Sequence, residues 1–175
     1  GWIALMLVGC AQSADESARP PDDAPPPAEA PAETQDPARA PADVEFAPEL
    51  AVDLDAMTLS ETGLYVQVLE EGDGPQAVPG DQLGVHYTVW LSDGSKLDSS
   101  FDKTPPAPYD LILGRTPLIA GWNEGVTGMR LGEKRRLVVP YQLGYRAEGR
   151  PPAIPGYSTL VFEVELAAHE PAAAE

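Results

Sequence analysis

The chain has little cysteine, histidine or positive charge, and each shortage excludes a class of function. Its 175 residues include one cysteine, Cys10, which excludes an internal disulfide and a cysteine-rich metal site. The two histidines are His86 and His169, the second in a C-terminal tail of Ala, Pro and Glu, so a metal hydrolase or a histidine-dependent triad is a poor fit. Only 11 Lys and Arg oppose 28 Asp and Glu, and the net charge of −17 would repel nucleic acid. We expect neither a metal nor a nucleic-acid partner.

Motifs of covalent and nucleotide chemistry are missing as well. The chain contains no Gly-x-Ser-x-Gly sequence, the turn that presents a catalytic serine in many hydrolases. Gly125 and Gly128 enclose a Val-Thr pair, but no lysine is placed beside them to contact a nucleotide phosphate. We therefore expect no cofactor.

Residues 1–10 are apolar throughout and carry no charge. They are too few to span a bilayer as a helix, which needs about 20 residues, and they fit the end of a secretory signal peptide. The chain starts without Met, and we expect a basic start to precede it. Leu7 to Cys10, Leu-Val-Gly-Cys, resembles a bacterial lipobox, in which the Cys is lipidated. Acyl chains on Cys10 would anchor the chain, since each buried methylene contributes about 0.8 kcal/mol. The alternative is a chance Cys after a signal peptide.

Residues 11–43 contain ten Ala, eight Pro and eight acidic residues, and no Val, Ile, Leu, Met, Phe, Tyr or Trp. Such a segment has no apolar area whose burial could offset the entropy lost on ordering. Proline and charge repulsion extend it toward polyproline II. We interpret it as a disordered tether. A proline-rich ligand for another domain is the alternative, although no basic anchor flanks the prolines.

The folded region is expected to follow. In residues 44–63 the apolar positions are irregularly spaced, which suggests a lead-in segment with a short helix. Residues 64–170 carry β-strand signals, of which 83–91 is the clearest, because every second residue is apolar. Further strands are expected at 64–69, 96–99, 109–113, 135–139 and 160–166, and one short helix at 121–127. This pattern predicts an α+β fold with an antiparallel sheet curled over the helix. Residues 171–175 are expected to form a disordered tail.

Aromatic residues gather in or near this expected core: Tyr87, Tyr109, Trp122, Tyr145, Tyr157 and Phe162. Filling the core would explain them. However, a buried tyrosine needs a partner for its hydroxyl, and an apolar concavity edged with Tyr and Asp is typical of a ligand site. Composition alone leaves both interpretations open.

An ordered series of motifs then carries a resemblance to a known family. The motifs are His86-Tyr87-Thr88, Asp93-Gly94, Leu97-Asp98-Ser99-Ser100, Leu113-Gly114, Leu118 to Trp122, Gly125-Val126, Met129, Gly132 to Arg136, Leu143-Gly144-Tyr145, Ile154-Pro155 and Thr159 to Phe162. In this order and spacing they resemble the FKBP-type peptidyl-prolyl cis-trans isomerases over roughly 64–167. The resemblance implies a five-stranded antiparallel sheet wrapped around one short helix.

The resemblance also implies an active site, an aromatic pocket between sheet and helix. Trp122 would form its floor and Ile154 would cap its rim. The implied walls are Tyr87, Leu97, Tyr109, Leu118, Ile119 and Phe162. Asp98 would bond to Tyr87 or to a ligand hydroxyl, while the Ile119 backbone N–H and the Tyr145 hydroxyl would bind substrate carbonyls. Tyr87, Asp98, Tyr145 and Phe162 are the implied catalytic residues. His86 falls on the opposite strand face from Tyr87 and is given no catalytic role.

The sequence departs from the family pattern at some of these positions. Leu97, Tyr109 and Leu118 replace the residues that are frequent there but keep the pocket apolar, so activity is expected to survive. Arg146 stands where Gly is common, and 154–156 read Ile-Pro-Gly in place of Ile-Pro-Pro. The changes at 146 and over 150–156 alter the rim loop, and with it the substrate preference and the affinity for macrolide inhibitors.

The sequence therefore predicts a lipid-anchored prolyl isomerase (rotamase) that acts on X-Pro-containing polypeptides and assists protein folding outside the cytoplasm. We expect a monomer that faces the periplasm. Ala11 after Cys10, in place of the Asp that holds many lipoproteins at the inner membrane, favours the outer membrane. Two alternatives remain: a non-catalytic proline-binding or chaperone module on a lipid anchor, and a structural envelope lipoprotein.

Overall fold

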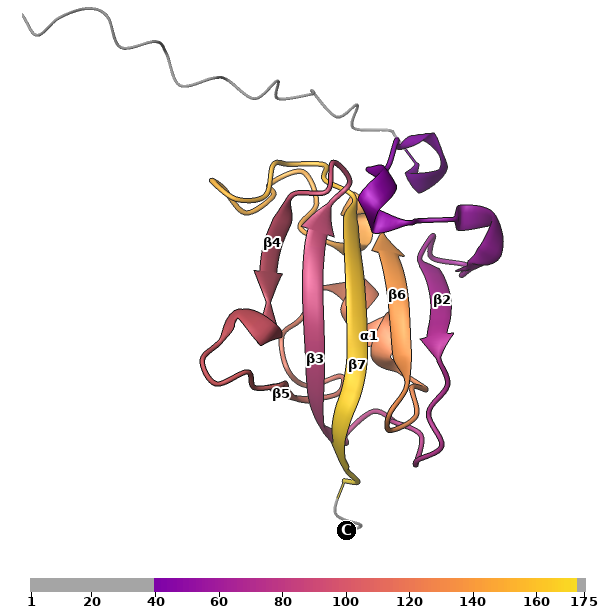
Figure 1. Ribbon diagram of the computed structural model, residues 1–175, viewed down its shortest axis with the longest axis vertical. Coiled ribbons are helices and arrows are strands. Elements are labelled where there is room, and N and C mark those ends of the chain that lie inside the picture. Colours follow the sequence, from indigo (N-terminus) through magenta and orange to yellow (C-terminus); the bar gives the residue numbers. More distant parts are fainter. Residues whose placement is uncertain (1–39, 173–175) are drawn as a thin grey trace, which may run out of the picture. The chain divides into compact units, whose positions relative to one another are not determined.

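The computed structural model describes residues 40–172 (Figure 1). The predicted signal-peptide end with Cys10 and most of the predicted tether lie outside the described residues, as do 173–175. Pro41–Asp43 form a short 3-10 helix, η1, in which Pro41 is buried, so the described structure starts ahead of residue 44. Within 40–172 no helix is long and apolar enough to cross a membrane.

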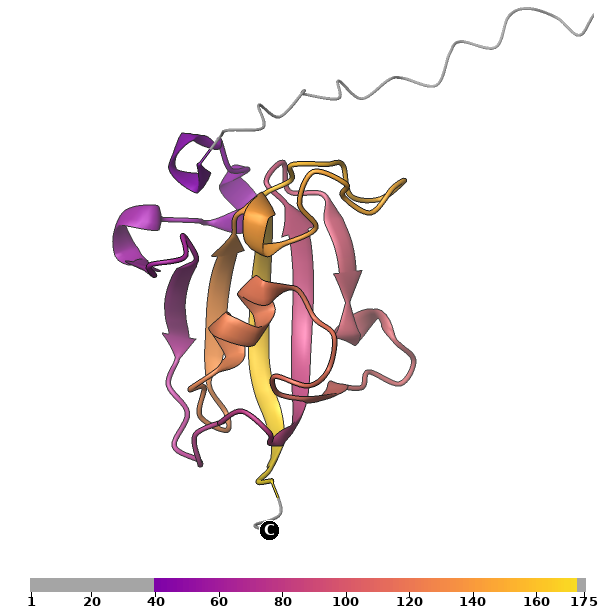
Figure 2. The same cartoon turned by 180° about the vertical axis from the view of Figure 1, so that it is seen from behind.

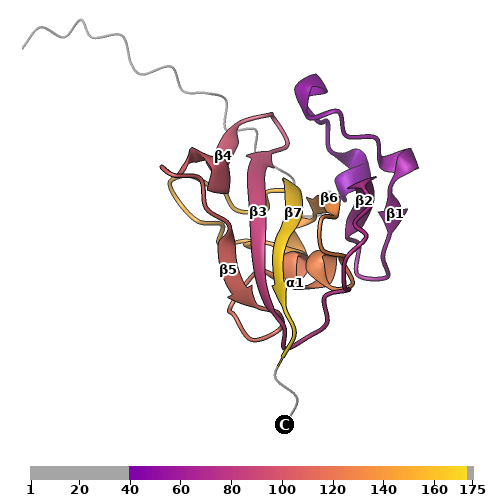
Figure 3. The same cartoon turned by 60° about the horizontal axis from the view of Figure 1, so that its bottom comes forward.

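The fold is built on one antiparallel sheet of seven strands in the order β1-β2-β6-β7-β3-β4, with β5 paired to β3 (Figure 3). The strands are β1 (Thr58–Leu59), β2 (Tyr65–Glu70), β3 (Gln82–Leu91), β4 (Lys96–Ser99), β5 (Tyr109–Ile112), β6 (Lys134–Val139) and β7 (Leu160–Glu170). Every strand predicted from alternation is present.

The sheet corrects the expected number of five strands, for two physical reasons. β3 is ten residues long and pairs through Thr88 to Trp90 with β4 but through Gln82 to Val85 with β5, so two strands share one position in the sheet. The other reason is β1, which adds two residues to the opposite edge by pairing with β2. A two-residue strand is too short to show any alternation.

The helix α1 (Ala120–Val126) lies across one face of the sheet (Figure 2), one residue ahead of the predicted range. Its two glycines allow a close approach to β6. A Cβ on Gly121 would come within 2.6 Å of Val139 Cγ1, and one on Gly125 would collide with Leu137. Trp122 is buried between helix and sheet, in the same apolar core as Leu137, Val139 and Phe162.

The other face of the sheet is partly covered by residues 41–57, here called the N-terminal strap. We expected a short helix here, but the strap consists of three separate 3-10 turns, η1, η2 (Pro48–Leu50) and η3 (Leu54–Ala56). Prolines begin the first two turns and break any longer helix. Leu50 and Met57 form a second apolar cluster with Val138 and Val161 of the sheet.

The C-terminal end corrects the placement of His169 in a tail. His169 belongs to β7, its side chain is 4% exposed, and its Nε2 lies 2.7 Å from Asp81 Oδ2. Asp81 also accepts hydrogen bonds from the backbone N–H groups of Val78 and Ala172. These bonds, that of Val78 first, lower the pKa of the Asp81 carboxyl. Ala172 is therefore tied to the sheet, although the tail was expected to start at 171.

Candidate functional site

A pocket of about 600 Å³ lies at the face of the sheet that α1 covers. The structure brings every predicted pocket residue to its lining: Tyr87, Leu97, Asp98, Tyr109, Leu118, Ile119, Trp122, Tyr145, Ile154 and Phe162. Sequence reasoning missed Val89 and Pro117, which also line it, and it assigned 150–153 to the rim loop without naming them as lining residues. Val89 could have been found, because it follows Tyr87 at the period of two that places both on one strand face.

Trp122 is the centre of the pocket, as its position on α1 requires. It is 5% exposed, and its ring meets three other aromatic rings edge to face. The centroid distances from Trp122 are 5.8 Å to Tyr87, 6.3 Å to Tyr109 and 6.4 Å to Phe162. These partners come from β3, β5 and β7, which are neighbours in the sheet. Such contacts stabilise aromatic pairs beyond simple burial, so the cluster forms a firm apolar floor.

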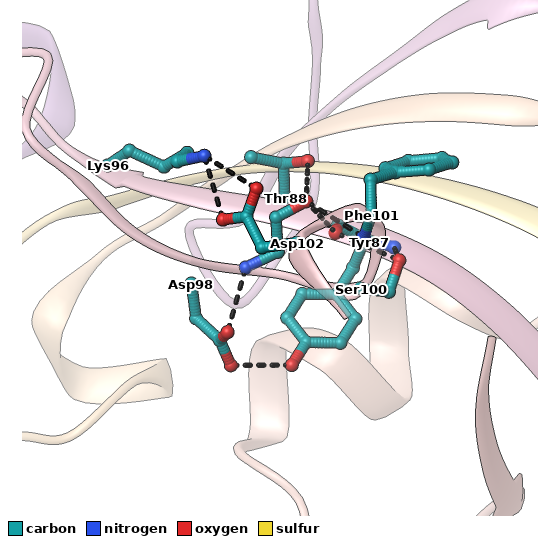
Figure 4. A network of polar contacts seen from close by, with 8 residues as sticks. Tyr87, Thr88, Lys96, Asp98, Ser100, Phe101 and Asp102 are labelled. Carbon is teal, nitrogen blue, oxygen red and sulfur yellow. Dashed lines mark hydrogen bonds and ion pairs between the residues drawn. The ribbon is translucent and has the colours of Figure 1, made fainter. Parts of the chain in front are cut away.

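One strongly polar contact interrupts this apolar lining. The Tyr87 hydroxyl donates a hydrogen bond to Asp98 Oδ2 at 2.6 Å, and Asp98 Oδ1 accepts from the Ser99 backbone N–H at 2.8 Å (Figure 4). Burial, and then the bond to the Asp98 carboxylate, raise the pKa of the Tyr87 phenol. Tyr87 is therefore a neutral donor whose hydroxyl is fixed at the pocket wall.

A buried serine pair holds Tyr87 from behind. Ser100 Oγ accepts from the Tyr87 backbone N–H at 3.0 Å, and the Ser99 hydroxyl donates to the Tyr87 carbonyl at 3.2 Å. Both serines are almost fully buried. Sequence reasoning quoted this pair without giving it a role, and the available signal was two adjacent hydroxyls at the end of the strand that carries Asp98.

His86 lies outside the pocket, on the opposite strand face, as its position beside Tyr87 predicted. Its Nδ1 is 3.0 Å from Ser100 Oγ, and its ring stacks on the exposed Phe101 ring at 4.6 Å. Neither His86 nor Phe101 lines the pocket.

Two donors at the pocket have no protein acceptor within residues 40–172. Ile119 precedes α1, and its carbonyl accepts from the N–H groups of Trp122 and Asn123, but its own N–H makes no hydrogen bond there. The Tyr145 hydroxyl likewise has no partner in this part of the chain, although Tyr145 lines the pocket. Both are therefore available to the carbonyl groups of a bound ligand.

The rim of the pocket is the loop between β6 and β7. Arg150 and Ile154 exchange two backbone hydrogen bonds of 2.8 and 3.0 Å, and the Gly149 N–H donates to the Tyr145 carbonyl. Gly149 has a positive φ of 61°, and a Cβ there would collide with the Ile154 carbonyl, so only glycine fits this bend. The loop has no regular period, so the sequence pattern did not single out 150–153 as lining residues, and only the family resemblance located Tyr145 and Ile154.

The described residues include no group of three or more His, Cys, Asp or Glu side chains that could hold a metal ion. The pocket offers an aromatic floor, one fixed hydroxyl and two free donors. This arrangement suits an apolar ring flanked by carbonyl groups.

Comparisons with family models, with curated proteins and with solved structures agree with one another. Residues 74–167 match the family model of the FKBP-type peptidyl-prolyl cis-trans isomerases. The chain is 47% identical over 104 residues to an FK506-binding protein of Neisseria meningitidis serogroup B, covering 59% of this chain and 94% of that protein. It is 52% identical over 87 residues to the human peptidyl-prolyl cis-trans isomerase FKBP2, covering 50% and 60%. Among solved structures, FkpA from Escherichia coli is similar with a TM-score of 0.61 and 38% identity, over 71% of this chain and 56% of that one.

Proposed function

The chain belongs to the family of FKBP-type peptidyl-prolyl cis-trans isomerases, and on that basis we propose that it rotates X-Pro bonds in the aromatic pocket over Trp122. The family and the enzyme class rest on the match over 74–167 and on the curated relatives. The observation that carries the assignment to this pocket is the aromatic floor beside the Tyr87–Asp98 hydrogen bond.

The chemistry requires only that the pocket binds a twisted amide better than a planar one. Rotation about a peptide C–N bond costs about 18–20 kcal/mol because resonance is lost, and free X-Pro bonds isomerise over tens of seconds or more. The twisted amide is less dipolar than the planar amide. A dry aromatic pocket therefore removes water from the transition state at a lower cost than from the ground state. Each tenfold of acceleration needs about 1.4 kcal/mol of this differential binding.

The donors of the site hold the substrate chain while the bond turns. The prolyl ring lies over Trp122, and the Ile119 N–H and Tyr145 hydroxyl donate to the carbonyl groups on either side. Tyr87 and Asp98 fix the pocket wall and offer a hydroxyl and a carboxylate to the substrate. No proton transfer is involved in this scheme. The support for it is that both donors are free in the described chain and line the same pocket as the aromatic cluster.

The site assignment is tested by comparing variants on a Leu-Pro test peptide. Tyr87→Phe, Asp98→Ala and Phe162→Ala are expected to lose most of the acceleration, because each removes a wall or donor of the pocket. Phe101→Ala is the matched control for Phe162→Ala, since Phe101 is an aromatic residue outside the pocket and 51% exposed. Circular dichroism confirms that each variant is folded. Folded pocket variants with wild-type rates would show that catalysis occurs elsewhere.

The setting of the enzyme is a further part of the proposal. We propose a lipid anchor on Cys10, substrates outside the cytoplasm and a monomeric chain that faces the periplasm, with the outer membrane favoured. The support is sequence alone: the apolar residues 1–10, the Leu-Val-Gly-Cys segment and the proline-rich, acidic residues 11–43. We also propose that macrolide inhibitors of this family bind in the pocket, with an affinity set by the altered rim.

A further inference from the structure

The pocket has few charged residues, and they differ in whether a neighbouring side chain engages them. Among the described residues that line it, only Asp98 and Arg150 are charged. Asp98 is engaged by the Tyr87 hydroxyl. Arg150 is exposed, and within residues 40–172 its guanidinium pairs with no carboxylate, whereas Lys96, Lys134, Arg135 and Arg136 all do. Arg150 is therefore a positive charge at the pocket that is free to meet a ligand.

The backbone of Arg150 is fixed although its side chain is free. Its N–H donates to the Ile154 carbonyl at 2.8 Å and its carbonyl accepts from the Ile154 N–H at 3.0 Å. Ile154 is itself anchored, because its side chain is 7% exposed. Two prolines, Pro151 and Pro152, follow Arg150 and restrict the loop further. The guanidinium thus starts from a defined point on the rim.

The charge of the chain, the apolar pocket wall and the shape of the guanidinium make Arg150 a selective contact for an acidic group. The chain as a whole carries −17, so an acidic segment is repelled by most of the surface. At the pocket mouth the wall is mainly apolar, and a charge beside a low-dielectric wall acts more strongly than one surrounded by water. A guanidinium also matches a carboxylate in geometry, since its planar fork can donate two parallel hydrogen bonds.

We propose that Arg150 is a specificity-determining residue that makes the pocket prefer X-Pro segments with an Asp or Glu next to the X-Pro pair. The inference rests on the proposed function, in which the prolyl ring lies over Trp122. An extended peptide advances about 3.3–3.6 Å per residue, so the residues beside the X-Pro pair emerge at the rim, within reach of an arginine side chain. An exposed ion pair corresponds to a preference of about two- to fivefold.

The experiment uses the full chain and a set of fluorescent peptides that share one Leu-Pro pair. Glu, Gln or Lys is placed either directly before the Leu or directly after the Pro. Dissociation constants are measured by fluorescence anisotropy, and isomerisation rates are measured on the same peptides. The variants are Arg150→Gln and Arg150→Glu, with Arg115→Gln as the matched control, because Arg115 is also an exposed arginine and does not line the pocket.

The expected result is that the wild type binds the Glu peptide about two- to fivefold more tightly than the Gln peptide at one of the two positions. Arg150→Gln removes this difference, Arg150→Glu transfers the preference to the Lys peptide, and Arg115→Gln leaves it unchanged. A charge reversal that reverses the preference is not explained by a structural role of Arg150.

Equal binding of the Glu and Gln peptides by the wild type, or a preference that survives Arg150→Gln, overturns the inference. Binding decides this question by itself. If the wild type prefers the Glu peptide but does not accelerate isomerisation, the proposed catalysis in this pocket is contradicted and the role of Arg150 remains in place. If the wild type accelerates isomerisation but binds the Glu and Gln peptides equally, only the role of Arg150 is contradicted.

Discussion

Burial and hydrogen bonding shift the pKa of the Tyr87 phenol in the same direction. Both raise the pKa of its phenol above the ordinary value of 10, so the hydroxyl keeps its proton throughout the neutral range. The neighbouring histidine, His86, faces the other side of the sheet and does not line the pocket. The polar wall of the site therefore depends on a neutral donor that does not titrate near pH 7.

The ratio kcat/KM for a Leu-Pro peptide is expected to stay nearly constant between pH 6 and pH 8, because Tyr87 stays protonated and catalysis moves no proton. The measurement is a series of isomerisation rates in buffers of constant ionic strength. Tyr87→Phe serves as the control, with an equally flat profile at a lower level. A steep, sigmoidal profile in this range would contradict the desolvation mechanism.

Among the elements, the N-terminal strap contributes to stability without touching the site. Leu50 and Met57 pack in one apolar cluster with Val138 and Val161. The strap lies on the face of the sheet opposite α1 (Figure 1). Arg136 adds a hydrogen bond of 2.7 Å to the Ala51 carbonyl. The catalytic face and the strap thus share the strands β6 and β7 but use alternate residues of them, which is the geometry that a period of two provides.

We therefore predict that Leu50→Ala lowers stability and spares activity. Leu50 is 6% exposed, and truncating a buried leucine costs about 2–5 kcal/mol through lost burial and the cavity left behind. Leu59→Ala is the matched control, since Leu59 is 56% exposed on β1 and its truncation should change little. Urea unfolding measures stability, and the Leu-Pro assay at low temperature measures activity. If the two variants unfold at the same urea concentration, the strap does not stabilise the sheet.

The elements also show how far the sequence predicts this fold. Strands such as 83–91 and 160–166 were predicted because alternation directly reflects one buried face. The strap was not, because its apolar residues are spaced by proline-led turns that have no period. His169 was misplaced for a different reason. The Ala-rich sequence around it resembles a tail, and the pairing of 168–170 with 82–84 of β3 shows that β7 continues through it.

The pocket residues likewise fall into a set that the sequence located and a set whose place in the lining only the structure revealed. Tyr87, Trp122 and Phe162 lie on a strand, a helix and a strand whose positions follow from local pattern, and the family motifs locate them. The lining residues 150–153 belong to a loop held by backbone hydrogen bonds, which side-chain patterns do not encode. The resemblance placed residue 150 in the rim loop, and the folded rim shows that Arg150 lines the pocket.

At the scale of the whole molecule, the chain combines a folded isomerase with a segment of very different composition. Residues 11–39 lie outside the described structure, and their sequence of Ala, Pro and acidic residues suits a spacer. A spacer between an anchor and the domain would let the pocket reach substrates away from the membrane surface. Lipidation at Cys10 is the premise of this arrangement, and it can be tested independently of catalysis.

We predict that Cys10 carries the acyl chains and that Ala11 directs the membrane location. The chain is expressed in a bacterium of two membranes with a basic start placed before Gly1, in the presence of a clickable fatty acid. The wild type should incorporate the label and fractionate with the outer membrane, because two or more acyl chains hold a protein durably. Cys10→Ser should lose the label, and Ala11→Asp should keep the label but move to the inner membrane. An unlabelled wild type would contradict the anchor while leaving the isomerase and its pocket unaffected.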